Sequence, residues 1–370
     1  MGRTTLRALA AFTAVLLAAT GVAACGGDDD DNGGGGGGGG GPKIALLLPE
    51  TKTTRYEEQD KPNFERHVKE LCSSCEVIYA NANQDPAKQQ QQAEAAITQG
   101  AKVIVISSVD VKSAGAIVQR AKQSDVKVIA YGRLIPDAPI DYYVSIDPFK
   151  VGQQQAEVQM EAIKKAGKSS PKVVMINGAP TDSNAKPYKD GATSVLKKDG
   201  AQIVKSFDTP DWSPDKAQQE MEQTITALGN NGFDAVYVAN DGMAGGAIAA
   251  LKGAQIDPST RFVTGQDAEL AGVQRILVGQ QLMTVYQPII QIAETAAEMA
   301  VPLAQGKSVP SDVAPDKVDN GQGEIPSALL DTVAIRPENV QDPLVKEGFL
   351  KASDICTGPY KEACEKYGVQ

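Results

Sequence analysis

Residues 86–131 read PAKQQQQAEAAITQGAKVIVISSVDVKSAGAIVQRAKQSDVKVIAY, a stretch in which amphipathic segments alternate with β-branched runs. The segments 86–100 and 112–124 have helical spacing, and Asp85 before Pro86 is a typical helix start. The runs 103–106 and 126–131 are short, β-branched and typical of buried strands. Helices that alternate with such strands indicate βαβ units around a parallel sheet.

The same alternation extends to both sides of this stretch and restarts after residue 147. With 370 residues, 42% of them hydrophobic, the chain can form two ordinary cores. The sequence therefore predicts an α/β fold of two lobes with parallel sheets. A segment rich in Pro, Asp and Gly up to Pro326 predicts a surface excursion and a late crossing between the lobes. Further strands are expected at 44–48, 77–80, 173–176, 203–207, 235–238, 262–264 and 283–286, and further helices at 56–71 and 289–304.

The N-terminus has the pattern of an export signal. Arg3 and Arg7 precede an apolar run at 8–19, and Val22-Ala23-Ala24-Cys25 follows with small residues. The run is shorter than the roughly 20 apolar residues that a membrane-spanning helix needs. The last four residues resemble the lipobox of bacterial lipoproteins, whose cysteine becomes the lipidated first residue; an ordinary cleaved signal is the alternative.

We therefore expect residues 1–24 to be a signal peptide and Cys25 to carry the lipid. Residues 25–42 are rich in Asp and Gly and have almost no side chain able to pack, so they are expected to form a flexible tether. This arrangement places the folded part outside the cell, anchored to the outer face of the membrane.

The composition excludes several classes of function. A formal net charge of -10 argues against a nucleic-acid partner. The single histidine, His67, falls in a helical pattern, and the chain has neither a Gly-x-Ser-x-Gly elbow nor a P-loop, which argues against an enzyme. The acidic run of the tether lacks the preorganised geometry of a metal site. We expect no cofactor and no metal.

The five cysteines divide into Cys25 and two disulfide pairs, Cys72 with Cys75 and Cys356 with Cys364. A redox motif at 72–75 is the alternative, but acidic neighbours at 70 and 76 disfavour a thiolate. A four-cysteine zinc site would need a second, nearby pair, which the sequence does not contain.

Polar and aromatic residues follow the expected strands at the ends where ligands bind in open parallel sheets. A sugar offers paired hydroxyls and apolar ring faces. Its binding site therefore needs bidentate Arg donors, acid and amide hydrogen-bond partners, and flat aromatic side chains. Trp212, the only tryptophan, lies in a proline-flanked loop and suits a ligand-covering role; a rim packing residue is the alternative. The candidate ligand-binding residues are Arg55, Tyr56, Arg133, Asp182, Asn184, Trp212, Asn240, Asp267 and Gln287.

Several of these residues have simpler interpretations. Arg55 could pair with Glu57 or Glu58 on a solvated face. Asp and Asn at strand ends often cap the next helix, and we expect Asp110 and Asp241 to do so.

Specific segments resemble the xylose-binding protein family of ABC sugar importers, with a match from about Lys43 to Phe349. This resemblance implies the type I periplasmic-binding fold, in which two Rossmann-like lobes joined by three strands close over one pentose or hexose. It implies an N-terminal lobe of residues 43–146 plus 288–327 and a C-terminal lobe of 147–287 plus 328–370. The resemblance is carried by YGRLI (131–135), TDSNAK (181–186), NDGMAGGA (240–247), GQDAELAG (265–272), MTVYQP (283–288) and IPS (325–327).

The resemblance also distributes the candidate contacts. Arg55, Tyr56 and Arg133 would line the first lobe, Gln287 would lie at the hinge, and the remaining five would line the second lobe. The family commonly has Asp at the position of Gly132 and Lys at that of Gln287, so a carboxylate and an ammonium are missing together. This departure puts xylose itself in doubt as the ligand and leaves room near Gly132 for a larger or differently oriented ring.

The implied function is a monomeric, lipid-anchored binding protein that delivers a monosaccharide to an ABC permease. A surface receptor that reports sugar to a membrane kinase is an alternative. A glycosidase in which Asp182 and Asp267 form the carboxylate pair is another. A repressor with the same sensor fold is disfavoured, because an export signal stands where its DNA-binding helices would be.

Overall fold

The computed structural model describes residues 40–370. The expected signal peptide, Cys25 and all but the last three residues of the expected tether lie outside the described residues. Within residues 40–370, no helix is both long and apolar enough to cross a membrane.

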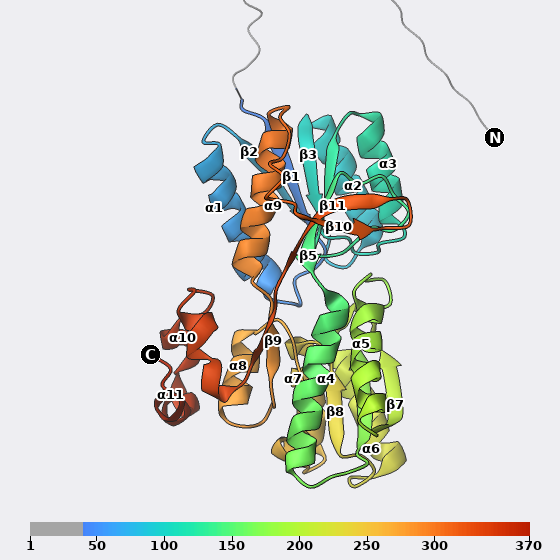
Figure 1. Cartoon of the computed structure of the whole chain (residues 1–370), viewed down its shortest axis with the longest axis vertical. Coiled ribbons are helices and arrows are strands. Elements are labelled where there is room, and N and C mark those ends of the chain that lie inside the picture. The colour runs from blue at the N-terminus through green and yellow to red at the C-terminus, as the bar shows by residue number, and fades with distance from the viewer. Residues whose placement is uncertain (1–39) are drawn as a thin grey trace, which may run out of the picture. The chain divides into compact units, whose positions relative to one another are not determined.

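The N-terminal lobe is built on a seven-stranded sheet in the order β10-β11-β5-β4-β3-β1-β2 (Figure 1). Strands β1 to β5 and β11 run parallel, and β10 pairs antiparallel with β11 at the edge. The strands are β1 (Lys43–Leu48), β2 (Glu76–Asn81), β3 (Ala101–Ile106), β4 (Lys127–Tyr131), β5 (Tyr142–Ile146), β10 (Asp316–Asp319) and β11 (Glu324–Leu330).

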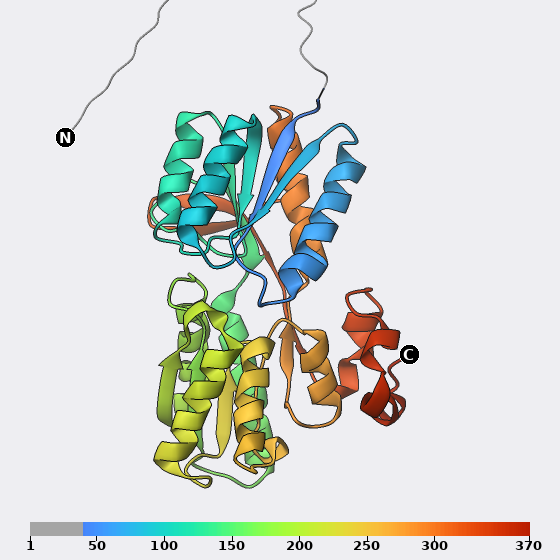
Figure 2. The ribbon, with the colours of Figure 1, turned by 180° about the vertical axis from the view of Figure 1, so that it is seen from behind.

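Helices cover both faces of this sheet because its strands are apolar on both sides. Along β1, Ile44, Leu46 and Leu48 belong to one core cluster, and Ala45 and Leu47 to another. Helices α1 and α9 pack on the first face, and α2 and α3 on the second (Figures 1 and 2). The helical elements are η1 (Tyr56–Asp60), α1 (Lys61–Leu71), α2 (Pro86–Thr98), α3 (Ala114–Gln123) and α9 (Ile289–Ala304).

The C-terminal lobe contains a parallel sheet, β7-β6-β8, and an antiparallel pair, β12-β9. Helices α4 and α5 lie on one side of these strands, and α6 and α7 on the other (Figures 1 and 2). The strands are β6 (Lys172–Asn177), β7 (Gln202–Asp208), β8 (Ala235–Val238), β9 (Thr284–Tyr286) and β12 (Val333–Ile335). The helical elements are α4 (Pro148–Lys165), α5 (Ala185–Lys198), η2 (Pro210–Trp212), α6 (Pro214–Leu228), α7 (Asp241–Gly253), η3 (Pro258–Thr260) and α8 (Leu270–Leu277).

The strand expected at 262–264 is not a regular strand, and this prediction was wrong in detail. The segment does lie between β8 and β9, where Thr264 N donates to Val236 O at 3.3 Å and Leu282 N donates to Val263 O at 2.8 Å. However, Phe262 has φ of 45°, and the next ladder donor, Val238 N, bonds to the side-chain Oγ1 of Thr264. Both features interrupt the backbone ladder.

Two further differences concern strands that the sequence did not reveal. Strand β5 was not expected, and β10 lies inside the Pro, Asp and Gly-rich segment that was expected to be irregular. Strand β11 continues to Leu330, which pairs with Ile146, so the boundary expected at 327/328 lies inside this strand. The first sheet is consequently mixed rather than parallel throughout.

The chain after β12 forms a compact tail on the C-terminal lobe. Its core contains Phe349, whose ring lies 4.9 Å from that of Tyr286 on β9. Cys356 and Cys364 form a disulfide in this tail, and Cys72 and Cys75 form another after α1. The tail elements are η4 (Pro337–Asn339), η5 (Gln341–Val345), α10 (Ala352–Ile355), η6 (Gly358–Tyr360) and α11 (Lys361–Tyr367).

Candidate functional site

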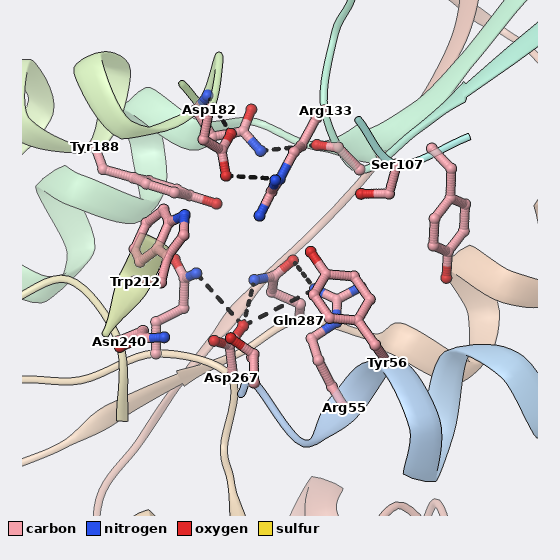
Figure 3. Close-up of a pocket in the computed structure, with 15 residues that line it drawn as sticks. Arg55, Tyr56, Ser107, Arg133, Asp182, Tyr188, Trp212, Asn240, Asp267 and Gln287 are labelled. Atoms are coloured by element: carbon pink, nitrogen blue, oxygen red, sulfur yellow. Dashed lines mark hydrogen bonds and ion pairs between the residues drawn. The ribbon is translucent and has the colours of Figure 1, made fainter. Parts of the chain in front are cut away.

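All nine candidate residues line one cavity between the lobes (Figure 3). Most of them come from the carboxyl end of a strand or the loop that follows, because parallel strands bring these ends to the same edge; Tyr56 lies on η1, and Asp267 follows the irregular segment 262–264. The cavity encloses about 460 Å³ outside protein atoms, part of it open to solvent.

Arg55, after β1, is held by a carboxylate that the sequence reading missed. Its Nε and Nη2 donate to both carboxylate oxygens of Asp60 at 2.9 and 2.7 Å, and Tyr131 OH donates to the same carboxylate. Asp60 is 1% exposed and Arg55 is 8% exposed. The alternative pairing with Glu57 or Glu58 on a solvated face does not occur: Arg55 is buried and bidentate, and it is fixed before any ligand arrives.

Arg133, after β4, makes an ion pair across the two lobes. Its Nε lies 2.8 Å from Oδ2 of Asp182, and its Nη1 donates to Ser108 O at 2.7 Å. Its Nη2 forms no hydrogen bond within residues 40–370, and this end of the guanidinium points toward the middle of the site (Figure 3). Burial lowers and Asp182 raises the pKa of Arg133, and the net direction is upward, so the group stays charged.

Asp267 and Gln287 form a chain of contacts with Arg55. Nη1 of Arg55 donates to Oε1 of Gln287 at 3.1 Å, and Nε2 of Gln287 donates to Oδ1 of Asp267 at 3.0 Å. The same Asp267 oxygen lies 3.9 Å from Nη1 of Arg55. Burial raises the pKa of Asp267 to about 6, against the lowering effect of Arg55. An amide suits this position because it accepts from the cation and donates to the anion.

Trp212 follows β7 and presents its indole to the cavity. Asp211 and Trp212 have φ of 60° and 51°, a local conformation that turns the indole inward. The indole packs over Gly178, where an added β-carbon would lie 2.1 Å from the ring, and meets Tyr188 edge to face at 6.4 Å. Trp212 is 6% exposed, and its Nε1 has no hydrogen-bond partner within residues 40–370.

Asn240 and Asn184 have structural contacts besides lining the cavity. Oδ1 of Asn240 caps α7 by accepting from Met243 N at 3.0 Å, and Nδ2 of Asn184 donates to Gly132 O across the lobes at 2.7 Å. Asn240 is therefore the cap of α7, and the expectation that Asp241 has this role was wrong. Asp110 does cap its segment, accepting from Lys112 N at 2.8 Å.

Asp241 lies instead inside the C-terminal lobe and is fully buried. Its carboxylate accepts from Gln281 Nε2 at 2.6 Å, from Thr284 Oγ1 at 2.8 Å and from Glu269 N at 3.0 Å. Burial raises its pKa to about 7. These contacts fix the backbone that leads from the irregular segment into Asp267.

Tyr56, on η1, is buried beside Arg55, whose guanidinium lies 5.3 Å from the centre of the Tyr56 ring. Its hydroxyl points toward the middle of the site (Figure 3). Burial raises its pKa, so it stays a neutral hydrogen-bonding group.

Thr53, Ser107 and Tyr188 were not expected as cavity residues, whereas Tyr131, Gly132 and Gln266 stand beside candidate residues at the expected strand ends. Ser107 directly follows β3, so the same strand-end rule would have found it, and Gln266 immediately precedes Asp267. Tyr188 lies within α5, where the sequence pattern matches that of a core residue. The full set of additional lining residues is Thr53, Ser107, Tyr131, Gly132, Tyr188 and Gln266.

The charged groups around the cavity are paired with one another, and Nη2 of Arg133 and Oδ2 of Asp267 keep hydrogen-bonding positions that no group within residues 40–370 uses. Each arginine has a protein carboxylate as its partner. Three buried atoms that line the cavity lack a partner within residues 40–370: Oγ of Ser107, Nε1 of Trp212 and Oε1 of Gln266. A neutral ligand with several hydroxyls satisfies such a set, whereas an ionic ligand would have to displace an existing ion pair. Among residues 40–370, no cluster of His, Cys, Asp or Glu could hold a metal ion.

Comparison with known proteins identifies the family. The sequence profile described as "Periplasmic binding protein domain" matches residues 44–308. The chain belongs to the periplasmic binding protein family. It is 36% identical over 317 residues to the D-xylose-binding periplasmic protein of Escherichia coli K12, covering 85% of this chain and 92% of that protein. It is 34% identical to the multiple sugar-binding periplasmic receptor ChvE of Rhizobium radiobacter, covering 73% and 81%.

Solved structures agree with this assignment. A solute-binding protein of an ABC transporter from Clostridium phytofermentans, with bound β-D-glucose, superposes with a TM-score of 0.75 at 28% identity, covering 85% of this chain and 99% of that one. A carbohydrate-transporter binding protein from Chloroflexus aurantiacus, in complex with D-glucose, gives 0.74 at 28% identity, covering 84% and 97%. The resemblance to sugar-binding periplasmic proteins and the two-lobed α/β fold are thereby confirmed. These relatives are receptors that bind sugars.

Proposed function

We propose that this periplasmic binding protein binds one monosaccharide, a pentose or hexose, in the cavity between its lobes and delivers it to an ABC permease. The observation that carries the proposal is the pairing of charges around the cavity. Because Arg55 and Arg133 are each paired with a carboxylate of the protein, the groups left for a ligand are the remaining hydrogen-bonding atoms of Arg133 and Asp267, neutral donors and acceptors, and an indole face.

Closure of the lobes over the sugar is part of this proposal. Contacts across the seam link Arg133 to Asp182, Asn184 to Gly132, and Thr54 N to Oε1 of Glu269 at 3.3 Å. A ligand that bonds to both lobes would favour this closed arrangement by its higher affinity for it. The closed pair of lobes would then present a composite surface to the permease.

The names of the relatives support a sugar as the ligand. The two curated relatives described above are named for xylose and for multiple sugars, and both solved neighbours hold glucose.

Titration calorimetry against pentoses, hexoses, inositols and amino acids tests the proposal. We expect one monosaccharide per protein and no binding of amino acids. A protein that binds no carbohydrate, or that binds an amino acid in this cavity, would contradict the proposal. Incubation of the protein with glycosides tests the glycosidase alternative, in which Asp182 and Asp267 act as a catalytic pair, and release of a product would support it.

We further propose that Cys25 is lipidated and that residues 25–42 tether the protein to the outer face of the membrane, where a tether of this length keeps it close to the permease. The support is the sequence VAAC at 22–25 followed by Asp and Gly. Fractionation of cells that express the full chain and Cys25→Ala should show membrane association only for the wild type. Equal membrane retention of both would refute the anchor.

An experiment that captures the membrane partner of the protein distinguishes import from sensing. The importer proposal expects the sugar-bound protein to be recovered with ABC membrane subunits. Recovery with a membrane kinase in place of a permease would support the receptor alternative.

A further inference from the structure

The wall of the cavity has a gap beside Gly132, directly after β4. Gly132 has φ of 71°. Among residues 40–370, and apart from its two chain neighbours, the only heavy atom within 4 Å of the position of an added β-carbon is Oγ of Ser107, at 3.9 Å. Because no side chain fills this position, ligand atoms can approach the backbone here to van der Waals distance.

Ser107 lies at the same part of the wall and lacks a partner. It is 1% exposed, and its hydroxyl forms no hydrogen bond within residues 40–370. The hydroxyl faces the cavity between Arg133 and Tyr56 (Figure 3). A buried hydroxyl without a partner is costly, so a polar ligand atom at this point would be favoured.

The protein cannot easily close this gap by relaxing. Gly132 N donates to Val144 O at 2.8 Å, and Gly132 O accepts from Ser145 Oγ at 2.8 Å and from Asn184 Nδ2 at 2.7 Å. Every polar group of the glycine is therefore engaged. The gap is a fixed part of the wall and is bounded by Ser107.

In the proposed site a pyranose ring would lie between Arg133, Trp212 and Asp267, and the gap beside Gly132 and Ser107 would accept a short substituent that ends in a hydroxyl. The exocyclic hydroxymethyl group of a hexopyranose has this size and chemistry, and a pentopyranose lacks it. We propose that Gly132 and Ser107 form a subsite for this hydroxymethyl group, so that the protein prefers hexoses to the pentoses of matching stereochemistry. This inference rests on the proposed monosaccharide-binding function.

Matched sugar pairs test the subsite directly. D-glucose and D-xylose differ only in the hydroxymethyl group, as do D-galactose and L-arabinose, and D-mannose and D-lyxose. For the pair that binds, we expect the hexose to bind roughly tenfold more tightly, because water can partly replace the missing hydroxyl when the pentose is bound. Equal or tighter binding of the pentose would overturn the subsite. Binding of none of the six sugars would overturn the subsite, and the proposed function falls as well only if no carbohydrate of the wider panel binds.

Two substitutions connect the preference to these residues. Ser107→Ala removes the hydroxyl and should weaken hexose binding more than pentose binding, which reduces the ratio of dissociation constants at least threefold. Gly132→Ala narrows the gap and should reduce the same ratio. Gly167→Ala is the matched control, because Gly167 has φ of 78°, no heavy atom within 4 Å of an added β-carbon, and no place in the cavity.

The control separates backbone strain from loss of the subsite. Gly167→Ala carries the cost of a positive φ but should leave both dissociation constants unchanged. If Gly132→Ala fails to fold, Ser107→Ala still gives the result, since it removes a single oxygen from a position with no partner. An unchanged ratio in Ser107→Ala would refute the role of Ser107.

Discussion

Replacement of Asp267 by Asn tests the electrostatic part of the site. The substitution keeps the shape of the side chain and removes its charge. Oδ1 of Asp267 accepts from Gln287 Nε2 at 3.0 Å, whereas Oδ2 forms no hydrogen bond within residues 40–370 and is available to a ligand hydroxyl. Asp267→Asn should therefore weaken sugar binding without disturbing the neighbouring contacts.

The expected loss follows from the type of hydrogen bond. A bond to a charged group contributes about 1.5 to 3 kcal/mol, and each 1.4 kcal/mol is a tenfold change in affinity, so the dissociation constant should rise roughly 12- to 140-fold. The free energy of unfolding should not fall in this variant. The folded pKa of Asp267 is raised to about 6, so its contribution to stability is present below the unfolded pKa and is lost as the pH rises through 6. At pH 7.5 the ionised carboxylate costs stability, and the neutral Asn removes that cost.

Tryptophan fluorescence provides the assay. Trp212 is the only tryptophan and lines the cavity, so its emission should report sugar binding directly, with calorimetry as the second measurement. Asp199→Asn is the control, because Asp199 pairs with Lys164 at 2.8 Å on the surface of the C-terminal lobe and should leave binding unchanged. A dissociation constant in Asp267→Asn within threefold of the wild-type value would show that the charge of Asp267 does not strengthen sugar binding.

Further predictions concern the pH dependence and the supports of the site. Because the pKa of Asp267 is about 6, lowering the pH from 7.5 to 5 should protonate it and weaken sugar binding by up to about tenfold in calorimetry, and equal affinity at both values would contradict this. Asp60→Asn leaves Arg55 buried beside a neutral amide and should lower the free energy of unfolding by about 3 kcal/mol or more in urea titrations, whereas a loss under 1 kcal/mol would show that the pair is dispensable. Gly178→Ala pushes the Trp212 ring aside, since the added carbon would lie 2.1 Å from it; we expect a loss of about 1 to 3 kcal/mol of stability and a shifted emission maximum, and an unshifted spectrum would be inconsistent with the packing.

Much of the fold could be predicted because local signals agree with the long-range arrangement. Short apolar runs mark β1, β3 and β4, and Pro86 and Gly100 mark the ends of α2, the helix that precedes β3. Strand β10 could not be predicted, because its sequence, DKVD, is polar and only its pairing with β11 makes it a strand. The irregular segment at 262–264 was missed because a positive φ at Phe262 has no local sequence signal.

The candidate site was accessible by the same rule, applied to strand ends. That rule places Arg133, Asn240 and Asp267 in one cavity because the carboxyl ends of parallel strands converge. The strand-end rule does not reveal which polar side chains hold the site residues in place. Asp60 supports Arg55 from the turn that follows it, and Asp241 is buried rather than capping, and both facts depend on packing between segments distant in the sequence.

A crystal structure of the protein with its tightest-binding monosaccharide tests the central claim most directly. We expect one sugar ring against the indole of Trp212, with its hydroxyls bonded to Arg133 from one lobe and Asp267 from the other. A sugar bound outside this cavity, or a ring held by one lobe alone, would show that the ligand is not bound between the two lobes.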